Sequence, residues 1–267
     1  MKKVYVHLGV FLLLAAFFLW GVWLYPHSGT LPSGASLEPP SWNHWMGTDN
    51  LGLDIYAQIS MGFFRSMAIG ITTAALTFLL GGILGISAGY LGGKVDMLVS
   101  FLINVMLSIP QLPVMIVIGA FWGQSTWNII GIIAAFSWAP IAKQLRAKTI
   151  SIRNAQYITL AKSYGGSHWY IIRRHMLLEL LPLLLVNAIA VVGAAIVQES
   201  SLAFLGLSDP LAKSWGLMIS RARSFQGIFF TDFWKWWLLP PVLALVFSTL
   251  SLRMLAKSLE QHWLKEV

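Results

Sequence analysis

Glu199 is the clearest ionisable residue inside a long apolar run of this chain, and it directly follows Gln198. Ionisable groups are costly in a lipid bilayer, so they are functional candidates by default. Glu199 could therefore stand at a gate or on a substrate path, with Gln198 and Asn187 as further polar candidates. We favour the alternative that Glu199 lies near the membrane surface, wetted or paired with Arg221 or Arg223, because span-end charges often reach the headgroups at little cost. Asn187 would then hydrogen-bond between helices, the commoner role of amides in spans.

Metal chemistry has little support in the residue types. No cysteine occurs, which excludes disulfides, thiolate nucleophiles and zinc-thiolate sites. The histidines are scattered over different segments, and no His-x-x-x-His pair shares a helix face. We predict structural or interfacial roles for them and no metal site. They are His7, His27, His44, His168, His175 and His262.

Nucleotide binding and catalysis are not expected either. The phosphate-binding pattern of a Gly-rich loop ending in Gly-Lys-Ser or Gly-Lys-Thr is absent, since Lys94 precedes Val95 and lacks the upstream glycine. A membrane enzyme or insertion factor would need acid, base or metal ligands concentrated at one depth, and the sequence shows no such set. We therefore predict no catalytic residue and no enzymatic activity.

A basic stretch, residues 143–179, is too long for a turn and too charged to span a membrane. It predicts a helix over about 155–164, a break at Gly165 and Gly166, and a second helix over 168–178, because glycine reaches backbone angles that strain other residues. Two interpretations remain open on these residues alone. The hairpin is either a rigid handle for a soluble partner or a basic loop that sets topology or binds anionic headgroups.

Composition places these residues in a membrane protein. The 267 residues are 57% hydrophobic and 10% charged, where soluble domains carry about a quarter charged residues. The net charge of +8 could indicate nucleic acid. However, the Lys and Arg residues cluster beside apolar segments, which is typical of cytoplasmic membrane loops, so no nucleic-acid partner is expected.

Six apolar stretches are long enough to cross a bilayer, which takes roughly 20 residues. The fold class is therefore all-α, a polytopic membrane protein with about six transmembrane helices. A cleavable signal peptide is the alternative for the first stretch, but no convincing cleavage site follows it. The stretches are residues 4–25, 66–90, two within 97–142, 180–202 and 236–252.

Three local features refine these spans. Residues 26–65 should be a loop or short interfacial helices, because they are polar and rich in Pro, Gly, Ser and Asn. Pro110 and Pro113 predict a kink in the third span, and residues 119–128 should contain the turn between spans three and four. The second span carries glycines suited to close helix packing in lipid, namely Gly81, Gly82, Gly85 and Gly89.

Basic residues predict the orientation. The 143–179 stretch contains seven Lys and Arg residues before its only acid, Glu179, so it should stay in the cytoplasm. An even number of spans then puts both termini on the same side. We expect a multi-pass protein of the inner, cytoplasmic membrane with residues 1–65 as the first helix and outer segment, and 66–267 as the main transmembrane domain.

Four motifs in chain order resemble one family. The run YITLAKSYGGS at 157–167, followed by RHML at 174–177, resembles the EAA loop of ABC importer permeases, although Thr159 replaces its usual Glu. The other motifs resemble the C-type subunits of peptide/nickel importers, which take dipeptides, oligopeptides or nickel. These are GTDNLGLD at 47–54, with Leu53 in place of Arg, AGYLGGKVD at 88–96, and SLAFLGL at 201–207 followed by SWG at 214–216.

The resemblance implies a permease subunit that forms a pathway for peptides or for nickel and metal chelates together with a second permease. An extracytoplasmic binding protein would deliver substrate, and two ATPase subunits would bind ATP and Mg, so no cofactor is expected on this chain. A secondary transporter is the alternative, but it would show inverted repeats and more intramembrane carboxylates. The loop would dock on an ATPase through Tyr157, Thr159, Ala161, Lys162, Gly165 and Gly166.

Overall fold

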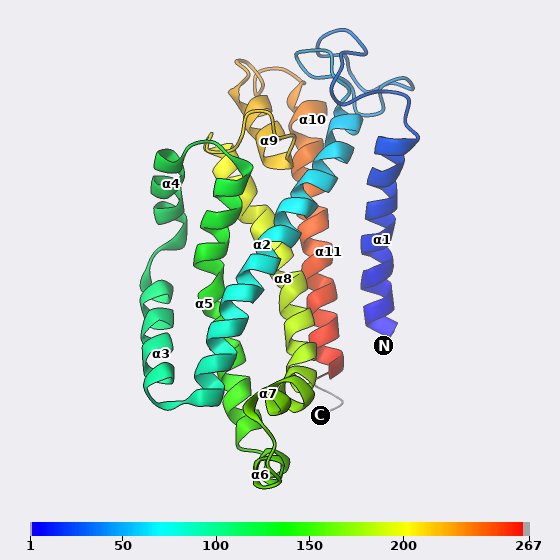
Figure 1. Cartoon of the computed structure of the whole chain (residues 1–267). Coiled ribbons are helices and arrows are strands. Elements are labelled where there is room, and N and C mark those ends of the chain that lie inside the picture. Colours follow the sequence, from blue (N-terminus) through cyan, green and yellow to red (C-terminus); the bar gives the residue numbers. More distant parts are fainter. Residues whose placement is uncertain (1, 264–267) are drawn as a thin grey trace.

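The structure is a computed structural model that describes residues 2–263, and within them every regular element is helical. Long helices run roughly side by side, with short helices at both ends (Figure 1). The elements are α1 (Lys2–Trp23), α2 (Ile55–Leu91), α3 (Gly93–Ser108), α4 (Gln111–Trp122), α5 (Thr126–Arg153), α6 (Gln156–Ser163), α7 (His168–Ile171), the π-helical turn η1 (Ile172–Met176), α8 (Leu177–Phe204), α9 (Trp215–Ser224), α10 (Trp234–Trp237) and α11 (Leu239–Trp263).

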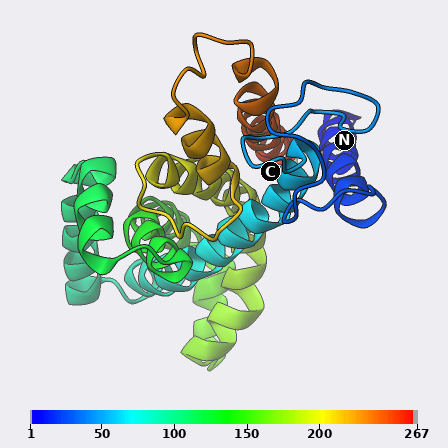
Figure 2. The ribbon, with the colours of Figure 1, turned by 90° about the horizontal axis from the view of Figure 1, so that it is seen from above.

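Five helical segments are long and apolar enough to cross a membrane, and the bent pair α3–α4 makes a sixth if counted as one span. The all-α, polytopic fold class is thus confirmed. The first turn of α1 and the last turn of α11 lie at the same end of the molecule as α6 and α7, as an even number of spans requires (Figure 1). Seen from above, α1 and the α3–α4 pair stand at opposite edges (Figure 2).

A seam of glycines joins α2 to α5 at the centre of the bundle. A Cβ atom on Gly85 would lie 2.5 Å from the carbonyl oxygen of Ala142, and one on Gly81 or Gly89 would lie 2.8 or 2.7 Å from other α5 carbonyl oxygens. The predicted close packing is therefore confirmed for these three residues, which are four apart and share one face. Gly82 is different, since a Cβ there would meet nothing within 4 Å.

The predicted kink in the third span is a full break. The axes of α3 and α4 differ by 87° across Ile109 and Pro110. Pro110 has no N–H with which to continue α3, whereas Pro113 lies in the first turn of α4, where a helix needs no such donor. The turn into α5 falls at Gly123 to Ser125, inside the predicted 119–128 window.

The start of the second span was predicted wrongly. Helix α2 begins at Ile55 and not near residue 66, so residues 55–65 belong to this long helix and are neither loop nor a separate short interfacial helix. Asp54 caps this helix by accepting a hydrogen bond from the Ala57 N–H at 2.9 Å. The first turns also bury apolar side chains, among them Ile55 and Ile59, against Trp215. The polar composition of residues 26–65 does not indicate this helix, whose apolar residues are buried in a core at the end of the bundle.

Candidate functional site

The α6–α7 hairpin is the candidate site, and it projects from the end of the molecule where α5 ends and α8 begins (Figure 1). Its predicted pattern of helix, glycine break and helix is confirmed. The side chain of Ile158 on α6 is fully buried and packs in one cluster with Ile171, Met176 and Leu180. One apolar anchor on each arm therefore holds α6 and the α7–η1 segment against the bundle, which makes the projection stiff.

The glycine pair closes the turn between the two arms. Gly165 has a φ of +83°, a region that side-chain-bearing residues rarely adopt. The Gly166 N–H donates to the Ala161 carbonyl oxygen at 2.9 Å, and a Cβ on Gly166 would lie 2.7 Å from that same oxygen. The Ser167 hydroxyl then accepts from the Tyr170 N–H at 3.2 Å and starts the second arm. The two glycines thus serve different needs, backbone angle and close approach.

Polar contacts tie the hairpin to its neighbours. The Tyr157 hydroxyl donates to Glu179 at the start of α8, and burial together with this carboxylate raises the pKa of Tyr157 to about 12, so it remains a donor at neutral pH. The Lys162 Nζ lies 5.2 Å from the ring centroid of Tyr90 on α2. The Tyr90 hydroxyl also hydrogen-bonds His168 Nδ1 at 2.8 Å. The hairpin is thus in direct contact with α2 and α8.

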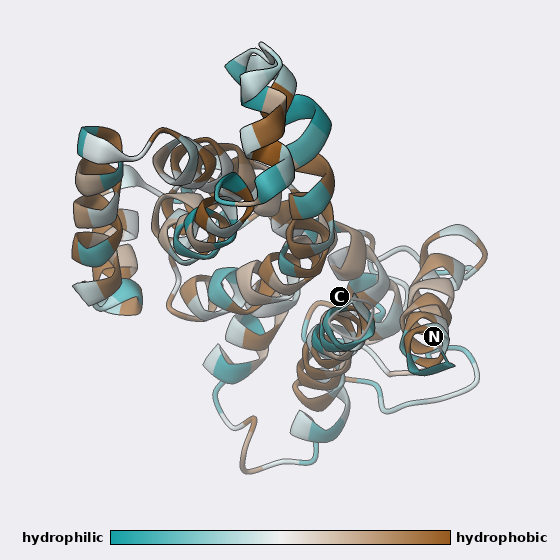
Figure 3. Cartoon of the chain, turned by 90° about the horizontal axis from the view of Figure 1, so that it is seen from below, coloured by the Kyte–Doolittle hydropathy of each residue, from teal (hydrophilic) through white to brown (hydrophobic). Residues whose placement is uncertain are grey.

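The outward surface of the hairpin is mixed apolar and polar. Leu160 is 57% exposed and Tyr164 88% exposed, while Thr159 is exposed between them and the buried anchor Ile158. Viewed from this end, hydrophobic and hydrophilic residues alternate on the projecting helices (Figure 3). Exposed aromatic and aliphatic side chains beside polar ones are typical of a protein-binding surface.

Glu199 lies at a different place, near the opposite end of α8, and it is 1% exposed. The favoured interpretation of a wetted or arginine-paired carboxylate is wrong. Arg221 donates to the Pro210 carbonyl oxygen at 2.5 Å, and Arg223 lies over the Phe204 ring. The Ser200 hydroxyl donates to Glu199 Oε2 at 3.4 Å, and the Oε1 atom has no hydrogen-bond partner among the described residues.

The other polar candidates on α8 have distinct surroundings. The Asn187 amide donates to Gln144 Oε1 on α5 at 2.9 Å, which is the interhelical role expected of it. Gln198 has a buried Oε1 atom that lacks a partner within the described residues. Neither Asn187 nor Gln198 lies next to the hairpin. The structure therefore separates the polar candidates of α8 from the candidate docking residues of the hairpin.

Sequence reasoning missed a cluster in the loop between α1 and α2. The prediction that the histidines are scattered is wrong for two of them, because the rings of His27 and His44 have centroids 4.5 Å apart, and Asp54 lies beside them. Residues 17 positions apart in a loop carry no periodicity that would place them together. The same loop explains the 47–54 motif. The Thr48 hydroxyl donates across the loop to the Ala35 carbonyl oxygen at 2.7 Å, and Asp49 Oδ1 accepts locally from the Leu51 N–H at 2.8 Å. Leu53, at the position of the expected Arg, is buried.

Known proteins with similar sequences fall in one group. The profile described as "Binding-protein-dependent transport system inner membrane component" matches residues 81–265. The probable D,D-dipeptide transport system permease protein DdpC of Escherichia coli K12 is 32% identical over 81% of this chain and 73% of its own length. The dipeptide transport system permease protein DppC of Bacillus subtilis 168 is 35% identical over 79% of this chain and 67% of its own length. The glutathione transport system permease protein GsiD of Pectobacterium atrosepticum is 33% identical over 84% of this chain and 75% of its own length.

Proposed function

Because the chain belongs to the binding-protein-dependent transport system inner membrane components, we propose that its α6–α7 hairpin is the element through which separate ATPase subunits drive it. The protein is a permease subunit of an ABC importer. We propose peptides as its substrate class, since the similar permeases are named for dipeptides and glutathione. A second permease would complete the pathway, and an extracytoplasmic binding protein would load it.

The anchoring of the hairpin on one side, with its other side exposed, is the observation that supports this mechanism. Ile158 is fully buried while Leu160 and Tyr164, two and six residues later, are exposed. A soluble motor can transmit displacement only through an element that is anchored on one side and accessible on the other. In this division of the chain, residues 1–65 would form the first transmembrane helix and the outer segment, with the first turns of α2, and 66–267 the permease domain with its coupling loop at about 143–179.

The assembly of the complex tests the docking surface. Leu160→Asp places a charge in the apolar part of this surface, and burying an unpaired charge is costly. We expect the variant to lose most of the ATPase subunits that co-purify with the wild-type chain in detergent. Phe230→Ala is the matched control, because Phe230 is 95% exposed at the opposite end. Equal ATPase recovery with Leu160→Asp and wild type would refute the assignment of the docking surface.

A further inference from the structure

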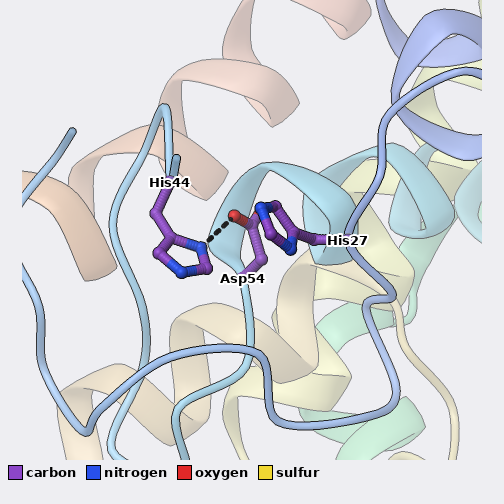
Figure 4. A group of neighbouring side chains, drawn as sticks. All are labelled: His27, His44 and Asp54. Carbon is purple, nitrogen blue, oxygen red and sulfur yellow. Dashed lines mark hydrogen bonds and ion pairs between the residues drawn. The ribbon is translucent and has the colours of Figure 1, made fainter. Parts of the chain in front are cut away.

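The loop between α1 and α2 carries a cluster of metal-ligand side chains at the end opposite the α6–α7 hairpin. His27, His44 and Asp54 each offer one ligand atom, and these atoms all lie within 4.8 Å of one another. Figure 4 shows the Asp54 carboxylate beside the two imidazole rings, with its hydrogen bond to His44 dashed. Asp54 and His44 are buried and His27 is half-buried, so the group is enclosed on most sides and reachable past His27.

The backbone holds Asp54 in a position to act as a ligand. Its Oδ1 atom accepts from the Ala57 N–H at 2.9 Å and caps α2. That bond leaves Oδ2 facing His44 Nδ1 at 2.8 Å and the Tyr25 hydroxyl at 3.0 Å. The carboxylate orientation is therefore set by the helix terminus and does not depend on an ion.

The second ring nitrogen of His44 faces another carboxylate. Glu38 Oε2 lies 3.8 Å from His44 Nε2, and Glu38 Oε1 is fixed by the Ala35 N–H at 2.9 Å. A carboxylate on the far side of a ligating imidazole orients the ring and raises its basicity. Gly34 leaves the space for this arrangement, since a Cβ there would lie 2.7 Å from His44 Nε2.

We propose that His27, His44 and Asp54 bind one divalent transition-metal ion, with Zn²⁺ the best match. Two imidazole nitrogens and one carboxylate oxygen suit a tetrahedral ion with water in the fourth position, whereas Mg²⁺ and Ca²⁺ prefer oxygen ligands alone. The ion takes the place of the hydrogen bond between His44 Nδ1 and Asp54, and the one proton of the neutral imidazole then lies on Nε2, toward Glu38, so that Nδ1 is free to bind the ion. It thereby ties the start of the loop, its middle and the first turn of α2 to one another.

Metal binding to the full-length chain in detergent, stripped first with a chelator, tests this directly. We expect titration calorimetry with Zn²⁺ to show one site, and Co²⁺ to give the visible absorption of a tetrahedral complex. His27→Gln removes a half-buried ligand and should weaken Zn²⁺ binding roughly tenfold or more. His44→Asn keeps an N–H for Asp54 but removes the imidazole, so it should have the same effect.

Controls separate lost ligands from lost structure. His175→Gln changes a histidine of the hairpin at the other end and should leave the Zn²⁺ affinity unchanged. Thermal unfolding of each metal-free variant should match that of the metal-free wild type, while Zn²⁺ should raise the midpoint only where the site is intact. The proposal fails if wild type binds no Zn²⁺, or if His27→Gln or His44→Asn binds it as wild type does.

Discussion

Gly165 is the residue that gives the turn of the hairpin its left-handed backbone angle. Its φ of +83° costs a residue with a Cβ about 1–2 kcal/mol, although a side chain there would meet nothing within 4 Å. Gly165→Val should therefore disturb the angle between the arms and not their packing. We expect reconstituted complexes with this variant to hydrolyse ATP without matching peptide uptake, measured together in proteoliposomes.

A more conservative substitution at the same position serves as the control. Asn tolerates left-handed backbone angles better than other non-glycine residues. Gly165→Asn should thus retain most of the coupling between hydrolysis and uptake. If Gly165→Val transports peptide as efficiently as wild type, the turn has no part in transmitting force.

At the scale of helices, the α2–α5 seam offers a matched pair of substitutions. Gly85→Ala places a methyl group 2.5 Å from the Ala142 carbonyl oxygen, and such overpacking typically costs about 1–3 kcal/mol. Gly82→Ala meets open space and should be neutral or stabilising by up to about 1 kcal/mol, because alanine favours the helix. Thermal unfolding in one detergent compares the two, and equal midpoints would show that the seam is not tight.

Most helices could be predicted from the sequence, and the exceptions have physical reasons. Apolar runs near 20 residues and the Gly165-Gly166 break determined the spans and the hairpin. The early start of α2 could not be predicted from the sequence, because it depends on the cap at Asp54 and on tertiary contacts that bury Ile55 against the distant Trp215. The enclosure of Glu199 and the approach of His27 to His44 were missed for the same reason, since no local pattern encodes either.

For the whole molecule, orientation in the membrane is the testable property, and the chain lacks cysteine, so single-cysteine variants report it cleanly. Tyr164→Cys, at an 88% exposed site of the hairpin, should react with a membrane-impermeant maleimide only after the cells are opened. Phe230→Cys, at the other end, should react in intact cells. Labelling of Tyr164→Cys in intact cells would invert the topology and remove the basis for ATPase docking.

The 87° break between α3 and α4 constrains what can surround this subunit. Pro110 offers no N–H to the Met106 carbonyl, and both Ser108 and Pro110 are exposed at the break. Hydrocarbon tails cannot solvate freed carbonyl groups, so irregular backbone at membrane depth persists only against protein or water. We therefore expect protein or water, and not lipid alone, beside the α3–α4 break if it lies within the hydrocarbon layer.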